Sequence, residues 1–124
     1  MTFYDKDGQP VAYAEDDGSI FLFSGEPVAY LDGDSVWSNS GKHLGWFDNG
    51  LIRDNSGKTA FFTENASGGP IKPIKGIKPI KGIKPIKGTK GLKPIKGIKE
   101  IKPIRAINSL AWSELSGEAF FYQD

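Results

Sequence analysis

The sequence offers few side chains that could carry out catalysis. Its 124 residues include no cysteine, one histidine and one methionine, so thiolate chemistry, disulfide bonds and cysteine zinc sites are excluded. His43 would need serine and aspartate partners to activate a nucleophile, but the serines and aspartates lie in predicted turns. We therefore expect His43 to be a structural residue at the end of a strand.

Acidic residues in the predicted turns could instead bind calcium. Asp5, Asp7 and Gly8 follow part of the D-x-D-x-D-G pattern of a calcium loop, but the third aspartate and the distal glutamate are missing. Aspartate and glycine are also the residues that tight turns prefer. The sequence contains neither a phosphate-binding glycine loop nor a dinucleotide fingerprint. It therefore predicts no metal, no cofactor and no enzymatic activity.

Charge is divided between two parts of the chain. The net charge is +1, but residues 70–105 carry 12 Lys and Arg against one Glu, whereas the other 88 residues carry 4 against 14. Regularly spaced lysines could contact the phosphates of a nucleic acid, or an anionic surface, without reading sequence. The acidic remainder would repel a polyanion. The division therefore favours pairing of the basic stretch with the acidic part of its own or a neighbouring chain.

A repeated phrase predicts the elements of the acidic part. At five places an aromatic residue follows a glycine by five positions, and the first four glycines are 17, 16 and 16 residues apart. The pairs are Gly8 and Tyr13, Gly25 and Tyr30, Gly41 and Trp46, Gly57 and Phe62, and Gly117 and Tyr122. The flanking residues alternate with the period of two typical of strands, and glycine supplies the positive φ that tight hairpins need. The phrases predict about ten short strands, with the last phrase forming a hairpin like the others.

Small residues occupy equivalent positions in the first three phrases. Ala12, Ala29 and Gly45 each lie four residues after the turn glycine. Small side chains at equivalent places indicate backbones that converge near a common axis, with the neighbouring aromatic residue on the opposite face. A radial arrangement of hairpins would produce this pattern, and a β-sandwich would explain it nearly as well. The predicted fold class is all-β, with antiparallel hairpins around a pseudo-symmetric axis.

Residues 70–108 form a different kind of sequence, made of thirteen triplets of Pro or Gly, an aliphatic residue, and Lys or Arg. Glu100 and Ala106 are the exceptions at the first position. Recurring Pro and Gly exclude an α-helix, and a period of three matches polyproline II. At about 3.1 Å per residue such a segment would span roughly 120 Å, against roughly 30 Å for the rest of the chain. The segment must therefore wrap around the body, fold back, or reach another protomer.

These features divide the chain into a body of residues 1–69 and 109–124 and an inserted segment of residues 70–108. We expect an isoleucine ridge to pack on apolar surface of the body while lysines reach the acidic turns at its margin. The candidate interaction residues of the segment are Ile77, Ile80, Ile83, Ile86, Lys78, Lys81, Lys84 and Lys87. On the body, Tyr13, Tyr30 and Trp46 are expected core residues; alternatively, they line a carbohydrate or peptide site.

Three stretches resemble the bacterial four-fold β-flower proteins: GEPVAYLDGDSVWSNSGKHLGWFDNGLIRD, FFTENASGGPIKPIK and SLAWSELSG. The resemblance covers nearly the whole chain and includes the position of the Lys-rich triplets between the fourth phrase and the last. It implies an all-β domain with petal-like hairpins around a pseudo-symmetric axis. It implies no activity and supplies no catalytic residues.

No targeting segment is visible, and no stretch approaches the 18 apolar residues of a membrane span. We expect a cytoplasmic, non-enzymatic structural or interaction module that could form homo-oligomers through the triplet segment or the last phrase. The alternative is a protein that binds polyanions, nucleic acid or an anionic surface, through its row of lysines.

Overall fold

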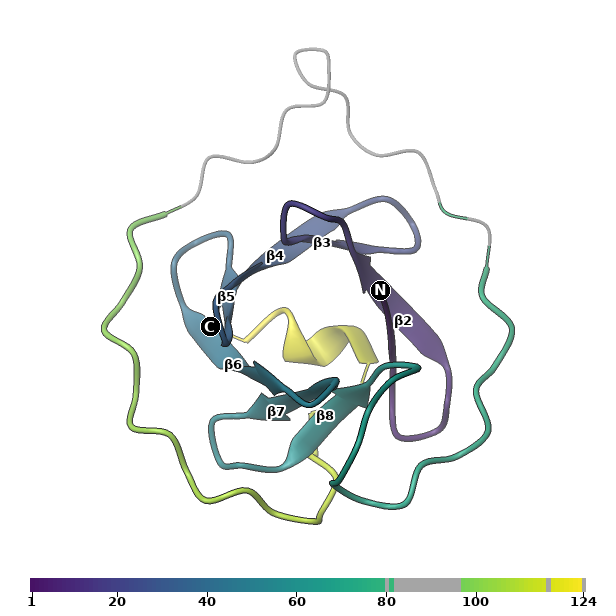
Figure 1. The fold of residues 1–124 in the computed structure, drawn as a ribbon. Coiled ribbons are helices and arrows are strands. Elements are labelled where there is room, and N and C mark those ends of the chain that lie inside the picture. Colours follow the sequence, from purple (N-terminus) through teal and green to yellow (C-terminus); the bar gives the residue numbers. More distant parts are fainter. Residues whose placement is uncertain (80, 82–96, 116, 124) are drawn as a thin grey trace.

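The computed structural model describes residues 1–79, 81, 97–115 and 117–123. In these residues eight antiparallel strands form a closed barrel, each strand pairing with the next along the chain and β1 closing on β8 (Figure 1). The strands are β1 (Thr2–Tyr4), β2 (Pro10–Ala14), β3 (Ser19–Leu22), β4 (Pro27–Asp32), β5 (Ser35–Ser38), β6 (His43–Asp48), β7 (Leu51–Asp54) and β8 (Thr59–Phe62). The predicted all-β fold class is confirmed.

The first four phrases form hairpins with the same local geometry. In each of the pairs β1–β2, β3–β4, β5–β6 and β7–β8 the register shifts by one residue near the turn. In each turn the glycine N–H donates to the carbonyl oxygen three residues before it. These glycines have positive φ values of 79° at Gly8, 101° at Gly25, 101° at Gly41 and 91° at Gly57. Because glycine adopts such values without steric cost, the predicted turns are confirmed.

Strand alternation gives the barrel an apolar interior. In each hairpin the residue four positions after the turn glycine pairs across the strands with a buried residue that points into the barrel. The inner pairs are Phe3 and Ala12, Ile20 and Ala29, Val36 and Gly45, and Ile52 and Phe61. The small residues thus face the barrel axis, as expected for hairpins arranged radially, and the sandwich alternative is excluded.

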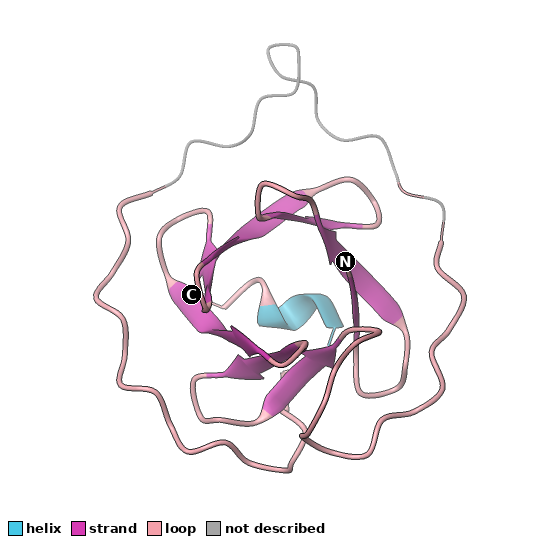
Figure 2. Cartoon of the chain, in the orientation of Figure 1, coloured by secondary structure: helices cyan, strands magenta, loops and turns pink. Residues whose placement is uncertain are grey.

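The last phrase does not form a hairpin. Its residues make a single 3-10 turn, η1 (Gly117–Phe120), which lies in the middle of the barrel (Figure 2). Phe120 and Phe121 are buried there, with ring centroids 5.4 Å and 5.3 Å from that of Phe61. The prediction of a fifth hairpin was wrong because a barrel that closes on itself leaves no strand edge for it. The two phenylalanines instead fill the interior beside Gly45, where an added Cβ would lie 3.1 Å from Phe120 Cζ.

The triplet segment, residues 70–108, follows the outside of the hairpins in its described parts (Figure 1). Exposure changes along it with a period of three, because Pro or Gly is the least exposed residue of most described triplets. This period fits three residues per turn, while the polyproline II conformation itself stays a prediction. No helix of the described chain has the length and apolar character needed to cross a membrane.

Candidate functional site: the triplet segment on the outer wall

The outer wall of the barrel carries a ring of aromatic side chains. Tyr13, Tyr30, Trp46 and Phe62 occupy the positions directly after the inner residues, so they lie on the opposite face of the sheet. All four are nevertheless buried, with exposed fractions of 1–7%. Some of this burial comes from neighbouring aromatic residues, as where Tyr13 stacks on Phe21 at 5.8 Å. Another part of the chain must supply the rest of the cover.

Cationic side chains of the triplet segment provide much of this cover. Lys81 Nζ lies 4.3 Å from the ring centroid of Tyr13, and Arg105 Cζ lies 5.4 Å from that of Trp46. A cation within about 6 Å of an aromatic face is attracted by the charge distribution of the ring. The aliphatic stem of the same side chain covers apolar surface. The wall aromatics and the cations of the segment therefore match each other in chemistry.

The cations also reach acidic side chains of the body. Lys78 Nζ lies 2.7 Å from Glu64 Oε1, and this hydrogen bond raises the pKa of Lys78 and lowers the pKa of Glu64. Lys99 pairs with Asp32 while its ammonium lies 5.2 Å from the centroid of Trp37. Further pairs join Lys102 to Asp34 and Arg105 to Asp34 and Asp48. Such exposed pairs are individually weak and are screened by salt.

The backbone of the segment contacts three of the hairpin turns in the same way. A Cβ added to the turn glycine would lie only 2.0–2.2 Å from a carbonyl oxygen of the segment, at Gly8 from Ile74, at Gly41 from Ile98 and at Gly57 from Ile107. Two residues further along the chain, an N–H donates to the carbonyl oxygen of the same glycine at 2.7–2.9 Å, from Gly76, Glu100 and Ser109 respectively. The turn glycines therefore serve two purposes, a positive φ and close approach of a second backbone.

These contacts explain three of the places where proline is replaced in the triplets, Gly76, Gly97 and Glu100. Gly76 and Glu100 stand at the first triplet position and donate their N–H groups to the turns, as does Gly97 to the carbonyl oxygen of Asn39 at 2.6 Å. Proline has no N–H to donate. A residue other than proline is therefore required wherever the first triplet position donates its backbone N–H to a hairpin.

Glu100 illustrates a functional residue that the sequence analysis noted only as an exception to the triplet pattern. Its carboxylate accepts a hydrogen bond of 2.7 Å from the backbone N–H of His43, at the start of β6. The first triplet position faces the barrel, so a long acidic side chain at this position can reach a free N–H of the wall. The irregularity in the repeat was the signal that could have identified it.

His43 lies on the outer wall beneath this contact. Its side chain is buried, with Nδ1 3.0 Å from Asn55 Oδ1 and Nε2 3.1 Å from Ser35 Oγ. Burial lowers the pKa of His43, and hydrogen bonding to Asn55 opposes this only in part. The order Ser35, His43, Asn55 resembles a nucleophile with its base, but Ser35 is 0% exposed and cannot meet a substrate. The structure places His43 where a structural strand-end histidine was expected.

A buried polar cluster holds the end of the segment, and no pattern in the sequence predicts it. Arg53 Nη1 donates to the carbonyl oxygens of Gly57 at 3.1 Å and Ser109 at 2.9 Å. Next to it, Asp54 Oδ2 accepts a hydrogen bond of 2.6 Å from Ser113 Oγ. Burial disfavours the charged form of Asp54, but the hydrogen bonds of Ser113 and the adjacent turn outweigh burial and lower its pKa. Arg53 and Asp54 thus connect the turn of β7–β8 to the residues that follow the segment.

The isoleucines of the segment face away from the barrel. Ile77 is 96% exposed, so the expectation that it packs on the apolar body is wrong. Ile77 stands at the second triplet position. The first position faces the hairpin turns and the cations of the third contact aromatic and acidic side chains, so the second position points to solvent. The same orientation defines an isoleucine ridge, Ile71, Ile74, Ile77, Ile98, Ile101, Ile104 and Ile107, in which each side chain is 92–96% exposed.

The other predicted interaction residues are distributed as follows. Lys78 and Lys81 contact the body as described above, whereas Ile80, Ile83, Ile86, Lys84 and Lys87 lie outside the described residues. Tyr13, Tyr30 and Trp46 are 2%, 4% and 7% exposed. These exposed fractions leave little aromatic surface for a sugar or peptide to contact.

Comparison with known proteins identifies the family. The sequence profile of the 4-fold beta flower protein family matches residues 1–121. The chain belongs to this family. No curated protein and no solved structure matches the chain. In this β-flower protein the petals are the four hairpins of the described residues, and the triplet segment passes along their turns.

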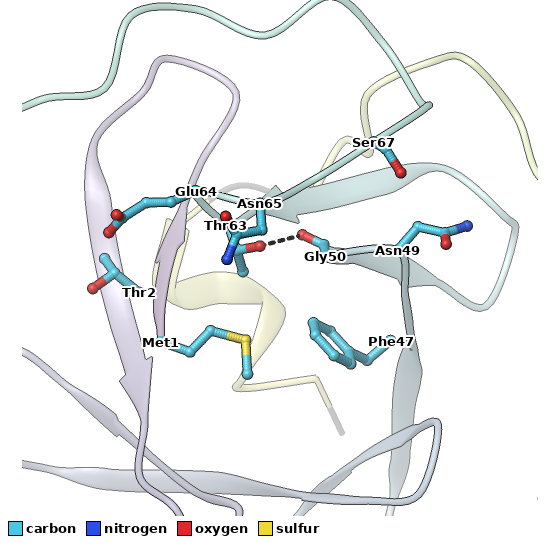
Figure 3. Close-up of a pocket in the computed structure, with 9 residues that line it drawn as sticks. All are labelled: Met1, Thr2, Phe47, Asn49, Gly50, Thr63, Glu64, Asn65 and Ser67. Carbon is cyan, nitrogen blue, oxygen red and sulfur yellow. Dashed lines mark hydrogen bonds between the residues drawn. The ribbon is translucent and has the colours of Figure 1, made fainter.

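The β-flower barrel also has a hollow at one end, between β1 and the turns after β6 and β8 (Figure 3). The hollow has a volume of about 610 Å³. Met1 and Phe47 project into it, and a hydrogen bond of 2.9 Å from Thr63 Oγ1 to the carbonyl oxygen of Gly50 lies at its edge. Glu64, Asn65 and Asn49 on its rim are exposed. In the part of the chain that the structure describes, no group of three acidic or histidine side chains is placed to hold a metal ion.

Proposed function

We propose that this β-flower protein is a non-enzymatic interaction module whose basic triplet segment is held on its own acidic, aromatic barrel. The barrel serves as a rigid support, and the segment forms its outer surface. In this arrangement the segment has a fixed path around the hairpins instead of acting as a solvated linker.

The repeated contact at the turn glycines carries this proposal. The same pair of contacts, a segment carbonyl against the glycine and an N–H two residues later to its carbonyl oxygen, occurs at Gly8, Gly41 and Gly57. A linker that merely joins two elements would not need to match three equivalent turns. The close approach at each glycine indicates that the backbone of the segment and the turns of the barrel are complementary.

Polyanion binding through the lysines is the alternative. It is less favoured because Lys78, Lys99 and Lys102 already face carboxylates of the same chain. A nucleic acid would have to displace these carboxylates and then remain next to them. Pairing within the chain thus removes much of the positive field that a polyanion would recognise.

Limited proteolysis tests the proposal. Trypsin cleaves poorly before proline, so the informative bonds in the described segment are Lys75–Gly76, Lys99–Glu100 and Arg105–Ala106. If the segment is held on the barrel, we expect all three bonds to be cleaved much more slowly in the native protein than in a peptide of residues 70–108. Cleavage at the peptide rate, with the barrel still folded by circular dichroism, would contradict the proposal.

A titration separates the two candidate functions. We expect a fluorescent single-stranded DNA or an acidic polymer to show no saturable binding at moderate salt. Tight binding that falls steeply as salt is raised is the property of a protein that neutralises phosphates. That result would favour polyanion binding over a segment whose lysines are paired within the chain.

A further inference from the structure

The barrel closes along a short seam between β1 and β8. These two strands share a single residue pair, Tyr4 and Phe62, whereas the other neighbouring strands share three or four pairs. This closure leaves no edge long enough for another hairpin, but it also leaves part of the edge of β1 without a strand beside it. Unpaired backbone groups at the edge of a sheet are a template for another extended chain.

At one end of the seam the chain itself supplies an extended stretch. The N–H of Thr59 donates to the carbonyl oxygen of Ala111 at 3.0 Å, and the N–H of Ser113 donates to the carbonyl oxygen of Thr59 at 2.7 Å. Thr59 and Trp112 thereby form a parallel bridge. Extended residues from outside the eight strands therefore complete the seam at this end.

At the opposite end of the seam Thr2 has no such partner. Met1 exchanges backbone hydrogen bonds with Ala14 of β2. The N–H of Asp5 likewise donates to the carbonyl oxygen of Gln9. Because the backbone groups of a strand alternate between its two edges, the N–H and C=O of Thr2 point toward the seam. No backbone hydrogen bond joins them to the described residues that follow β8.

The hollow at the end of the barrel lies beside Thr2 (Figure 3). Its volume of about 610 Å³ is typical of pockets that hold small ligands. Met1 and Phe47 project into it, and an edge contact with Phe3, with ring centroids 6.4 Å apart, fixes the ring of Phe47. The hollow therefore places an apolar surface next to an unpaired backbone donor and acceptor.

A short extended peptide matches both parts of this surface. One of its residues can exchange two backbone hydrogen bonds with Thr2, as in an antiparallel sheet. The residues on either side of it would then point their side chains into the barrel, onto Met1 and Phe47. Glu64 on the rim pairs with Lys78, so these two charges cancel and apolar side chains fit the hollow better than charged ones.

We propose that the seam beside Thr2 binds a short extended peptide, which adds to β1 as a strand and packs apolar side chains against Met1 and Phe47. The site uses none of the turn glycines that hold the triplet segment. The inference therefore goes beyond the proposed function and does not depend on it.

A nuclear magnetic resonance titration of the whole chain tests the inference. The probes are acetyl-Thr-Val-Thr-Val-Thr-amide and two analogues with leucine or phenylalanine in place of valine. We expect saturable shifts of the Thr2 and Phe47 amides with a Kd of about 0.1–5 mM for at least one peptide, and slower hydrogen exchange of the Thr2 N–H. The same peptide with its threonine nitrogens methylated cannot donate to β1 and should bind at least about 10-fold more weakly.

Two variants of Thr2 test the backbone contact from the side of the protein. Thr2→Pro removes an N–H that has no partner in the described chain, and proline is tolerated on such an edge. We expect this variant to keep its stability and to bind the peptide about 5–10-fold more weakly. The matched control Thr2→Val keeps the N–H and should bind within about 2-fold of the wild type.

The inference is wrong if none of the three peptides shifts these amides at up to about 10 mM, or if the methylated peptide or Thr2→Pro binds as tightly as its control. Glucose that shifts the same amides where the peptides do not would assign the hollow to a hydroxylated ligand instead. Should Thr2→Pro fail to fold, hydrogen exchange in the wild type decides. Slow exchange of the Thr2 N–H without peptide would show that it already has a partner, which contradicts the inference, whereas fast exchange that the peptide slows supports it.

Discussion

The two faces of the barrel wall are covered by later parts of the same chain, but with different chemistry. On the inner face Phe120 and Phe121 pack against Phe61 with no charged group between them. On the outer face, cations such as Lys81 lie over aromatic rings such as that of Tyr13. The inner cover excludes water, whereas the outer cover keeps its charges at the surface and is exposed to salt. The same strands can therefore be covered by apolar side chains on their inner face and by amphipathic side chains on their outer face.

The inner cover should contribute more to the free energy of unfolding than the outer cover does. Replacing Phe120 with alanine should lower the free energy of unfolding by about 3–5 kcal/mol, because the deletion leaves a cavity among residues that cannot collapse into it. Urea denaturation of the variant and the wild type measures this loss. Tyr122→Phe, at a side chain that is 50% exposed, is the matched control and should change stability little. A loss below about 1 kcal/mol for Phe120→Ala would contradict a filled interior.

The outer cover should depend on close approach of two backbones. In Gly41→Ala the new Cβ would lie 2.0 Å from the carbonyl oxygen of Ile98. We expect a loss of about 2–4 kcal/mol from strain and from the displaced hydrogen bond of Glu100, together with faster tryptic cleavage after Lys99. Gly33→Ala is the control, because Gly33 also has positive φ but no atom within 4 Å of the added Cβ.

The control should lose about 1 kcal/mol through backbone conformation alone and should keep the protection of the segment. Equal losses in the two variants, with unchanged cleavage in both, would show that the segment does not touch this turn. That outcome would leave the outer wall without the cover described here.

The outer wall also predicts a dependence on pH. Burial lowers the pKa of His43 in the folded protein, so below about pH 6.5 the unfolded chain binds a proton that the folded chain does not. The stability that is present above this pH should therefore decline as the pH falls toward the folded pKa, by up to about 1.4 kcal/mol per pH unit. Thermal unfolding at pH 5.0–7.5 measures the decline.

His43→Gln should remove this part of the pH profile, because glutamine does not titrate. The lowered pKa of Asp54 acts in a separate window: its stabilisation is present above the ordinary pKa of about 4 and is lost at lower pH. A decline between pH 6.5 and 5 that persists in His43→Gln would contradict the assignment to this histidine.

The smallest effect should come from shortening the segment. The contacts at Gly41 and Gly57 are nine residues apart in the segment, from Ile98 to Ile107, whereas 24 residues separate Ile74 from Ile98 across two hairpin steps. At nine residues per hairpin, two steps need 18 residues, so the stretch from Ile74 to Ile98 has six more than it needs. Deleting residues 88–93, which lie outside the described part, should therefore shift the melting temperature by no more than about 2 °C. Deleting residues 103–105 breaks a nine-residue step, and a larger shift there is the required contrast.

The repeated hairpins were predictable because their signals are local. Glycine at each turn and an aromatic residue five positions later determine the turn, the bulge and the two faces of each pair of strands. The small residues Ala12 and Ala29 indicated a common axis, and the barrel has one. Predicting these features requires only residues close together in the sequence and the period of two of a strand.

The two errors concerned residues whose positions depend on the closed barrel. The phrase around Gly117 resembles the others, but closure by β1 and β8 leaves it no edge, so its aromatic residues fill the interior. Ile77 resembles a core residue, but hydrogen bonding turns the first triplet position inward and the isoleucine outward. In both cases the deciding contact joins residues far apart in the sequence, and local patterns do not report such contacts.

The position of η1 at the far end of the chain has a consequence for biosynthesis. About 60 residues separate β8 from Phe120, so at ordinary translation rates the wall leaves the ribosome roughly 3–12 s before the side chains that fill it. During that interval Phe61 and its inner neighbours have no aromatic partner from η1, and the nascent barrel exposes an apolar interior. Molecular chaperones that recognise such surfaces would meet this protein before its last residues arrive.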